Sequence, residues 1–152
     1  MLTGEFRNSL DEKGRLLIPS RIRSEIAGNL LVLTRGMDHC LWLFPPTEWA
    51  ALSESLMRAA SPFTRKARMM QRRIIAPAQE VELDKAGRVD IPSSLMQSAG
   101  LKRDCAILGI NRYLEIWDVE AYDAYLEETE PEFQQAAEEL GGFVSFFDAE
   151  SR

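Results

Sequence analysis

The sequence predicts an α+β fold in which one supersecondary unit occurs twice along a single chain. The nine residues at positions 11–19, DEKGRLLIP, return at positions 84–92 as DKAGRVDIP, which is an offset of 73 residues. The match continues without a gap into the following hairpin and helix, where Trp49 corresponds to Tyr122. Two copies are too few for a solenoid, which needs at least about three repeats. They favour a domain with internal pseudo-two-fold symmetry, the single-chain equivalent of a symmetric dimer.

Each copy of the motif predicts a tight polar turn that leads into a short buried strand. Gly14 and Gly87 occupy the turn position that needs a left-handed backbone, which other residues adopt at a cost. Asp11 and Asp84 precede an arginine by four residues, so we expect each to cap its turn and pair with that arginine. A second interpretation, compatible with the first, is that the two arginines face a ligand.

The pattern of apolar runs and turn residues predicts the elements of the first copy. Ser20 and Thr47 are expected to be helix N-caps, and Pro45 and Pro46 are expected to end the preceding strand. The predicted elements are a strand over 4–10, a turn over 11–15, a strand over 16–18, a helix over 19–27, strands over 30–34 and 40–44, and a helix over 48–60.

The second copy repeats this order, with Ser93 and Asp118 as the expected helix N-caps. Pro131 is expected to interrupt the helical segment that follows, and Gly141 to end it. The predicted elements are a strand over 81–83, a short helix over 94–99, strands over 105–108 and 114–117 around a turn over 109–112, and a final helix after position 118.

The stretch between the copies, 63–73, is the most basic part of the chain and is expected to be helical. It is interpreted as a solvated helix face or a subunit contact, with direct contact to nucleic acid as the alternative. The predicted domain organisation is a first repeat with its helix over 4–60, a basic helical connector over 61–80, a second repeat over 81–126, and an acidic helix and tail over 127–152.

The net charge of −6 is distributed unevenly along the chain. Residues 1–122 contain 17 Lys and Arg against 15 Asp and Glu, a net charge of +2, whereas residues 123–152 carry a net charge of −8. Such asymmetry indicates an acidic tail beside a more basic body. No apolar run reaches the roughly 18 residues of a transmembrane helix, and the first residues lack the apolar segment of a signal peptide. We therefore expect a cytoplasmic protein without a membrane partner.

Few residues support catalysis or metal binding. Cys40 and Cys105 do not occupy equivalent positions in the two copies and are expected to be reduced, partly buried side chains. His39 is the single histidine and has no paired-ligand spacing around it, so no metal site is expected. The chain has no Gly-rich phosphate loop and no nucleophile elbow. We expect a protein that is not an enzyme and that has no catalytic residues and no cofactor.

Paired loops that present arginine from a doubled β-rich unit suit the recognition of double-stranded DNA. Lysine, arginine and backbone N–H groups contact phosphates, and the arginine fork fits guanine in the major groove. That groove is wide enough to admit a β-ribbon or a pair of loops.

The run LDEKGRLLIPSRIR at positions 10–23, followed by LDKAGRVDIP at positions 83–92, resembles the MraZ family, tandem members of the AbrB/SpoVT-like group of transition-state regulators. The resemblance extends from Met1 to about Gly142. It implies a swapped-hairpin, double-split β-barrel-like pseudo-dimer with flanking helices. It further implies a homo-oligomer, commonly an octameric ring, that regulates transcription in the cytoplasm and nucleoid. Family members bind short direct repeats upstream of the division and cell-wall gene cluster that includes their own gene.

In that family the arginine of the first motif carries DNA binding, and here this residue is Arg15. Because Arg21 and Arg23 correspond to Ser94 and Met96, the first copy is expected to make the heavier contact. The expected roles are base recognition by Arg15, phosphate contact by Lys13, Arg7, Arg21 and Arg23, a weaker second contact by Arg88 and Lys85, and loop structure from Asp11, Gly14, Asp84 and Gly87.

An alternative function is a ring-forming protein-interaction scaffold without sequence-specific DNA binding. The basic stretch 63–73 favours it, as do three phenylalanines of the C-terminal tail, which could dock on a neighbour. Disorder is nevertheless the default expectation for a chain terminus. These tail residues are Phe143, Phe146 and Phe147.

Overall fold

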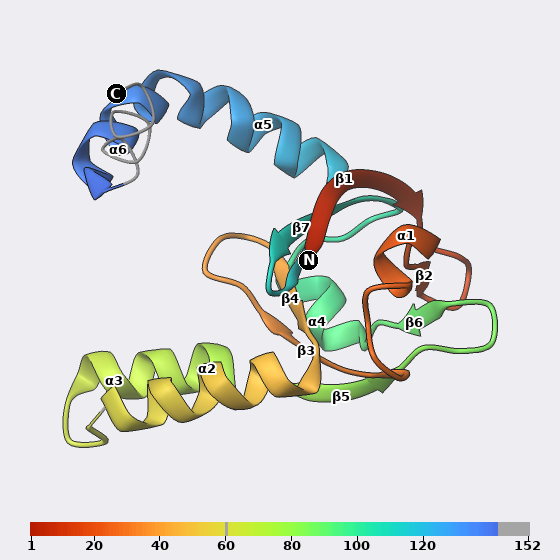
Figure 1. The fold of residues 1–152 in the computed structure, drawn as a ribbon, viewed down its shortest axis with the longest axis horizontal. Helices are drawn as coiled ribbons and strands as arrows, with labels where there is room; N and C mark the ends of the chain where they lie inside the picture. Colours follow the sequence, from red (N-terminus) through yellow and green to blue (C-terminus); the bar gives the residue numbers. More distant parts are fainter. Residues whose placement is uncertain (60, 143–152) are drawn as a thin grey trace, which may run out of the picture. The chain divides into compact units, whose positions relative to one another are not determined.

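The computed structural model describes residues 1–59 and 61–142 of the chain. The chain divides into two compact units, Met1–Val119 and Glu120–Arg152, and the first contains the strands and the helices α1 to α4 (Figure 1). None of the helices in the described part is long and apolar enough to cross a lipid bilayer.

The first unit alternates short strands with short helices (Figure 1). Its elements are β1 (Leu2–Ser9), β2 (Arg15–Leu17), α1 (Ser20–Arg23), β3 (Leu30–Arg35), β4 (Leu41–Phe44), α2 (Pro46–Ala59), α3 (Arg65–Met70), a π-helical segment (Gln71–Ile75), β5 (Gln79–Glu82), β6 (Arg88–Asp90), α4 (Ser93–Ser98), β7 (Asp104–Asn111) and β8 (Leu114–Asp118).

The strands are related by an internal two-fold symmetry. Six of them form an antiparallel sheet in the order β1-β7-β8-β4-β3-β5, and β2 and β6 form a separate two-stranded ribbon. The 73-residue offset exchanges β1 with β5, β3 with β7, and β4 with β8, so that the sheet reads the same from either edge. Trp42 faces Glu115 at the centre of the sheet and Leu16 faces Val89 at the centre of the ribbon, and both are pairs of equivalent residues. A pseudo-two-fold axis therefore passes through both layers.

Each repeat supplies a strand to the other. β1 of the first repeat pairs with β7 of the second along its full length, and β5 of the second repeat pairs with β3 of the first. The predicted α+β class and the interlocked pseudo-dimer of two repeats are confirmed. β1 and β5 are the edges of the six-stranded sheet, so the described residues form an open, barrel-like arrangement rather than a closed barrel.

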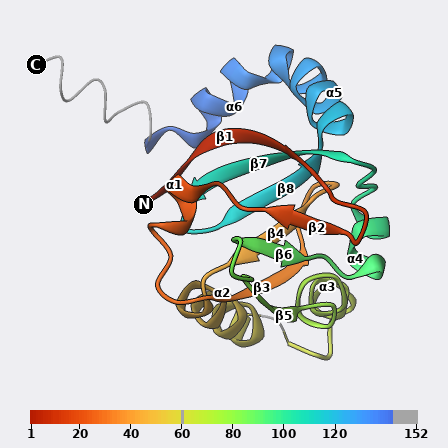
Figure 2. The same ribbon diagram turned by 90° about the vertical axis from the view of Figure 1, so that its right-hand side faces the viewer.

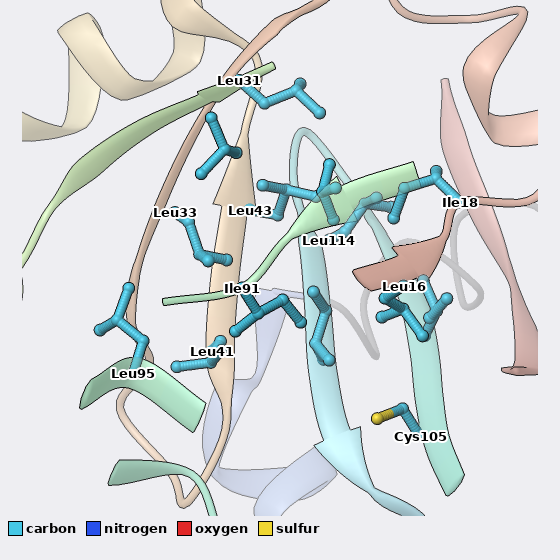
Figure 3. Close-up of a cluster of buried hydrophobic side chains, with 14 of the residues drawn as sticks. Leu16, Ile18, Leu31, Leu33, Leu41, Leu43, Ile91, Leu95, Cys105 and Leu114 are labelled. Carbon is cyan, nitrogen blue, oxygen red and sulfur yellow. The ribbon is translucent and has the colours of Figure 1, made fainter. Parts of the chain in front are cut away.

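The ribbon packs on the sheet through one shared hydrophobic core (Figure 3). Leu16 and Ile91, from the two repeats, lie in the same buried cluster as Leu33, Leu43 and Leu114 of the sheet. Fully burying one such side chain contributes roughly 1.5–3 kcal/mol. Because the cluster draws on both repeats, each repeat depends on the other to cover its apolar face.

The two cysteines lie in this interior. Cys40 and Cys105 are free thiols, as predicted, but they are fully rather than partly buried. Burial raises the pKa of each thiol to about 12, with the neighbouring Glu115 carboxylate adding to the effect at Cys40. The reactive thiolate is therefore suppressed at neutral pH.

The starts of α1 and α4 differ from the prediction. Pro19 and Pro92 occupy the two N-cap positions, and neither helix has a side-chain cap bond. Each proline has a ψ of 141°, the extended backbone that an N-cap residue adopts. Ser20 and Ser93 are therefore the first helical residues and not the caps.

Helix α1 is also shorter than the predicted 19–27. After Arg23 the backbone bonds tighten, because Glu25 N donates to the carbonyl of Ile22 and Ile26 N donates to that of Arg23. This i→i−3 pattern is the 3₁₀-type closure that commonly ends a helix.

Helix α2 begins at Pro46, so Thr47 lies inside its first turn and is not its N-cap. The fixed φ of proline suits the first helical position, where its missing N–H costs nothing. The predicted turn of the second hairpin is also wrong. β7 continues to Asn111, whose φ is +68°, because it pairs with the long strand β1 as far as Leu2.

The basic stretch 63–73 is not one regular helix. The Thr64 hydroxyl accepts a hydrogen bond from Ala67 N at 3.2 Å and caps α3, and the π-helical segment follows. Arg73 Nε donates to the carbonyl of Gly36 at 2.9 Å, which fastens the end of the stretch to the β3–β4 hairpin. Arg73 therefore has a structural role.

The described part of the second unit is helical, and its helices are interrupted at Pro131, as predicted. Asp118 immediately precedes its first helix, and Gly141, with a φ of +54°, follows its last. The elements are α5 (Val119–Thr129), which starts at the last residue of the first unit, a 3₁₀ turn (Glu130–Glu132) and α6 (Phe133–Leu140). The tail residues Phe143, Phe146 and Phe147 lie outside the described residues.

Candidate nucleic-acid interface

The two motif loops meet at the β2–β6 ribbon, which faces the viewer in Figure 2. Because the ribbon is antiparallel and centred on the pseudo-axis, the loops enter it from opposite ends. Each loop is tied to the strand of the other repeat: Ile18 N donates to the carbonyl of Gly87, and Ile91 N to that of Gly14, both at 3.0 Å. The two loops therefore form one structural assembly.

Asp11 organises the first loop. Its Oδ1 accepts hydrogen bonds from the backbone N–H groups of Lys13 and Arg15, both at 2.9 Å, and its Oδ2 accepts one from Arg15 Nε at 2.7 Å. Gly14 has a φ of +76° and closes the turn. The predicted cap, ion pair and left-handed glycine are confirmed here.

Asp84 organises the second loop in the same way. Its Oδ1 accepts from the backbone N–H groups of Ala86 and Arg88, and its Oδ2 accepts from Arg88 Nε, all at 2.9 Å. Gly87 has a φ of +86°. One loop geometry has thus been built twice from two copies of one motif.

The two arginines lie near each other across the pseudo-axis. Arg88 Nη1 is 3.6 Å from Asp11 Oδ2, so the second arginine also reaches the first loop. The side chains of Arg15 and Arg88 retain 29% and 34% of their exposure. Within the described residues, Arg15 donates no hydrogen bond from its two terminal amino groups. These groups are free to bind an external acceptor.

Protonation of the two loop carboxylates should weaken the backbone hydrogen bonds that they accept. The pKa of Asp11 lies below the usual 3.8, mainly because the Arg15 N–H binds its carboxylate, and Asp84 is lowered in the same way by Arg88. A lowered pKa means that the ionised form favours the folded loop, so this stabilisation is complete above about pH 4 and is lost as pH falls through the folded pKa.

We therefore expect the amide resonances of Arg15 and Arg88 to move at a midpoint below pH 3.8 in an NMR titration. Loop amides that titrate above 3.8 would contradict the proposed carboxylate cap.

The remaining candidate cations are divided between the loops and β1. Lys13 and Lys85 are exposed on the two loops. Arg7 is exposed on β1, and Arg21 donates from α1 to the carbonyl and hydroxyl oxygens of Thr3, also in β1, at 3.1 and 3.2 Å. Arg7 and Arg21 therefore lie along β1 rather than at the loops.

Arg23 belongs to the first repeat but lies at the second loop. Its Nε donates to the carbonyl of Ile18 at 2.9 Å, and its guanidinium rests against Gly87. A Cβ atom added to Gly87 would fall 2.6 Å from Arg23 Nε, which is too close for a real contact. Arg23 therefore braces the loop of the other repeat.

Comparison with known proteins identifies the family. A family model described as "MraZ protein, putative antitoxin-like" matches the chain twice, over residues 1–73 and 74–143. The chain belongs to the MraZ family. The boundary between the two matches reproduces the 73-residue offset of the repeated motif.

Several members of the MraZ family are similar along almost their whole length. "Transcriptional regulator MraZ" of Treponema denticola is 49% identical over 140 residues, which cover 92% of this chain and 97% of the relative. The protein of the same name from Treponema pallidum (strain Nichols) is 48% identical over 91% of this chain and 93% of its own. That of Natranaerobius thermophilus is 40% identical over 94% of this chain and 99% of its own. The relatives are named as regulators and not as enzymes, which agrees with the predicted absence of catalysis.

Sequence reasoning missed one residue that positions the ribbon in this MraZ family member. Asn8 Nδ2 donates to the carbonyl of Leu17 at 2.7 Å and so joins β1 to β2. Its equivalent in the second repeat is the buried Val81. The signal in the sequence was the polar Asn8 at a position where the second repeat has an apolar residue.

A groove beside the sheet was also missed. It has a volume of about 410 Å³ and is lined by aromatic side chains, including Trp42, Phe44 and Tyr113. Arg112 Nε pairs with Glu48 Oε2 at 2.7 Å at this groove. The residues that line this groove come from β4, from α2 and from the β7–β8 hairpin, so the linear sequence pattern gave no sign of it.

Proposed function

We propose that this chain is a transcriptional regulator that binds double-stranded DNA through the face of the β2–β6 ribbon. The observation that carries the proposal is the pair of equivalent loops, each presenting an arginine that is fixed by an aspartate and remains partly exposed. A prepositioned guanidinium loses less side-chain freedom when it binds, which favours planar, bidentate recognition. The name shared by the relatives supports the same function.

The proposed division of labour follows the positions of the cations. Arg15 reads base edges, because its free amino groups match the two acceptors of guanine in the major groove. Lysine and arginine side chains around it contact phosphates, which fix the register without reading sequence. The proposed phosphate contacts are Lys13, Arg7, Arg21 and Arg23, with Arg88 and Lys85 as a second and weaker contact.

The proposed targets are short direct repeats upstream of the division and cell-wall gene cluster that contains the chain's own gene. The protein acts there on the nucleoid in the cytoplasm, as a homo-oligomer in the form of an octameric ring. Residues 1–122 carry a net charge of only +2, so one subunit neutralises few phosphates and binds weakly. Several subunits on successive repeats multiply the affinity through their effective concentration.

The test is a binding titration of the purified full chain against a duplex from its own upstream region and a shuffled duplex of equal length. We expect preference for the natural duplex, with log K falling against log[salt] by about 0.9 for each phosphate contacted. Equal affinity for both duplexes and a response that does not depend on salt would contradict the proposal.

The second candidate function is the ring-forming scaffold without sequence-specific binding. Phe63 is 91% exposed at the start of the basic stretch 63–73, and Met69 is also exposed, which favours a protein contact there. In this case the same titration shows no preference between duplexes, while light scattering of the free protein still gives the mass of an oligomer.

A further inference from the structure

A polar pocket of about 270 Å³ lies beside the second loop and is built by both repeats. Its polar character contrasts with that of the aromatic groove, and its walls carry more cationic than anionic groups. Its lining includes Arg23, Gly28 and Asn29 from the first repeat and Asp84, Lys85 and Gly87 from the second.

The cationic groups of this pocket are not neutralised by its carboxylate. Both oxygens of Asp84 are occupied by the backbone of its own loop and by Arg88 Nε. Arg23 is fixed by the Ile18 carbonyl through Nε alone, and in the described residues its terminal amino groups make no hydrogen bond. Lys85 is exposed at the pocket and likewise has no partner among the residues that the structure describes.

The first loop has no such pair of cations. The repeat equivalent of Arg23 is Met96, whose Cε would lie 3.0 Å from a Cβ added to Gly14. The equivalent of Lys85 is Glu12. Methionine therefore covers the glycine of the first loop as Arg23 covers that of the second, but it carries no charge. At these two positions the pseudo-symmetry is broken in a way that favours an anion beside the second loop.

We propose that Arg23 and Lys85 form a phosphate-binding site that is shared between the two repeats. Its ligand is a phosphate group, supplied either by the DNA backbone or by free inorganic phosphate. A guanidinium held by a carbonyl and a neighbouring ammonium provide the charge-assisted donors that phosphate oxygens require. The inference deepens the proposed DNA binding and rests on it: Arg15 reads bases from the first loop, and the second loop anchors a phosphate.

The test uses Arg23→Met in the full chain, because this change copies the arrangement at Gly14. Arg58→Met, on the exposed face of α2, is the control with the same loss of charge. We expect Arg23→Met to reduce the salt slope of DNA binding by about 0.9, equally for natural and shuffled duplexes, and the control to leave the slope unchanged. If Arg23→Met lowers the melting temperature, Lys85→Met replaces it, because Lys85 is exposed. The expected reduction in the salt slope of DNA binding is the same.

A second arm titrates inorganic phosphate while the Gly87 amide and Arg23 Nε resonances are followed by NMR. Saturable shifts of the Gly87 amide in the wild type that vanish in Arg23→Met support a site for free phosphate as well. An altered salt slope without these shifts supports a site for the DNA phosphodiester only. If the wild type shows the phosphate-induced shifts but binds no DNA, the phosphate site stands and the proposed DNA-binding function is rejected. An unchanged slope in both variants together with no phosphate-induced shift overturns the site.

Discussion

Replacing Arg15 by alanine is expected to weaken binding to the natural upstream duplex by roughly 5- to 150-fold, as a lost bidentate arginine–guanine contact is worth roughly 1–3 kcal/mol. The same change should reduce the preference over a shuffled duplex, because the lost contact is to a base edge. Fluorescence anisotropy at fixed salt measures both quantities. The reason lies in the loop, where Asp11 fixes Nε and leaves the terminal amino groups of Arg15 free.

Two controls make this result specific. Arg15→Lys keeps the charge but removes the bidentate fork, so it should restore non-specific affinity without restoring preference. Arg58→Ala removes a remote charge and should leave binding unchanged. If Arg15→Ala folds normally and binds the natural duplex as tightly as the wild type, Arg15 does not read bases.

Replacing Leu16 by alanine should lower the free energy of unfolding by about 2–5 kcal/mol, the usual cost of truncating a buried leucine. Leu16 is fully buried at the centre of the ribbon and belongs to the core that joins both repeats. Chemical denaturation followed by circular dichroism measures the change.

The matched control for this change is the next residue of the same strand. Leu17 is 40% exposed, so Leu17→Ala should cost well under half as much. Similar losses for the two variants would mean that the ribbon is not packed on the sheet as the structure describes.

Local features of the loops could be predicted from the sequence because their partners lie close along the chain. The pairing of Asp11 with Arg15 spans four residues, and Gly14 needs its left-handed backbone for the turn itself. The exact repeat offset also carried information about the whole fold, because equivalent residues face each other at the pseudo-axis. Leu16 and Val89 form such a pair.

Features that depend on the exchange of strands could not be predicted in this way. Arg23 reaches Gly87 only because the ribbon places the second loop beside the first repeat. β7 extends to Asn111 only because β1 of the other repeat pairs with it there, and its equivalent β3 lacks so long a partner. The helix starts were misjudged for a different reason, since the prolines themselves occupy the N-cap positions of α1 and α4.

The symmetry of the backbone and the asymmetry of the side chains have different consequences. The equivalent turns at Asp11 and Asp84 hold two arginines in the same geometry, which suits a ligand with regular spacing. The differences at Arg23 and Lys85 then give the two loops different tasks. A tandem chain can vary one copy in this way, whereas a symmetric homodimer changes both copies with every substitution.

Amide hydrogen exchange of the full chain, with and without its natural duplex, distinguishes the two loops from α3 as the surface that contacts DNA. We expect slower exchange on DNA at both loops, 11–15 and 84–88, with little change in α3 over Arg65–Met70. Protection confined to α3, with both loops exchanging as in the free protein, would contradict this expectation.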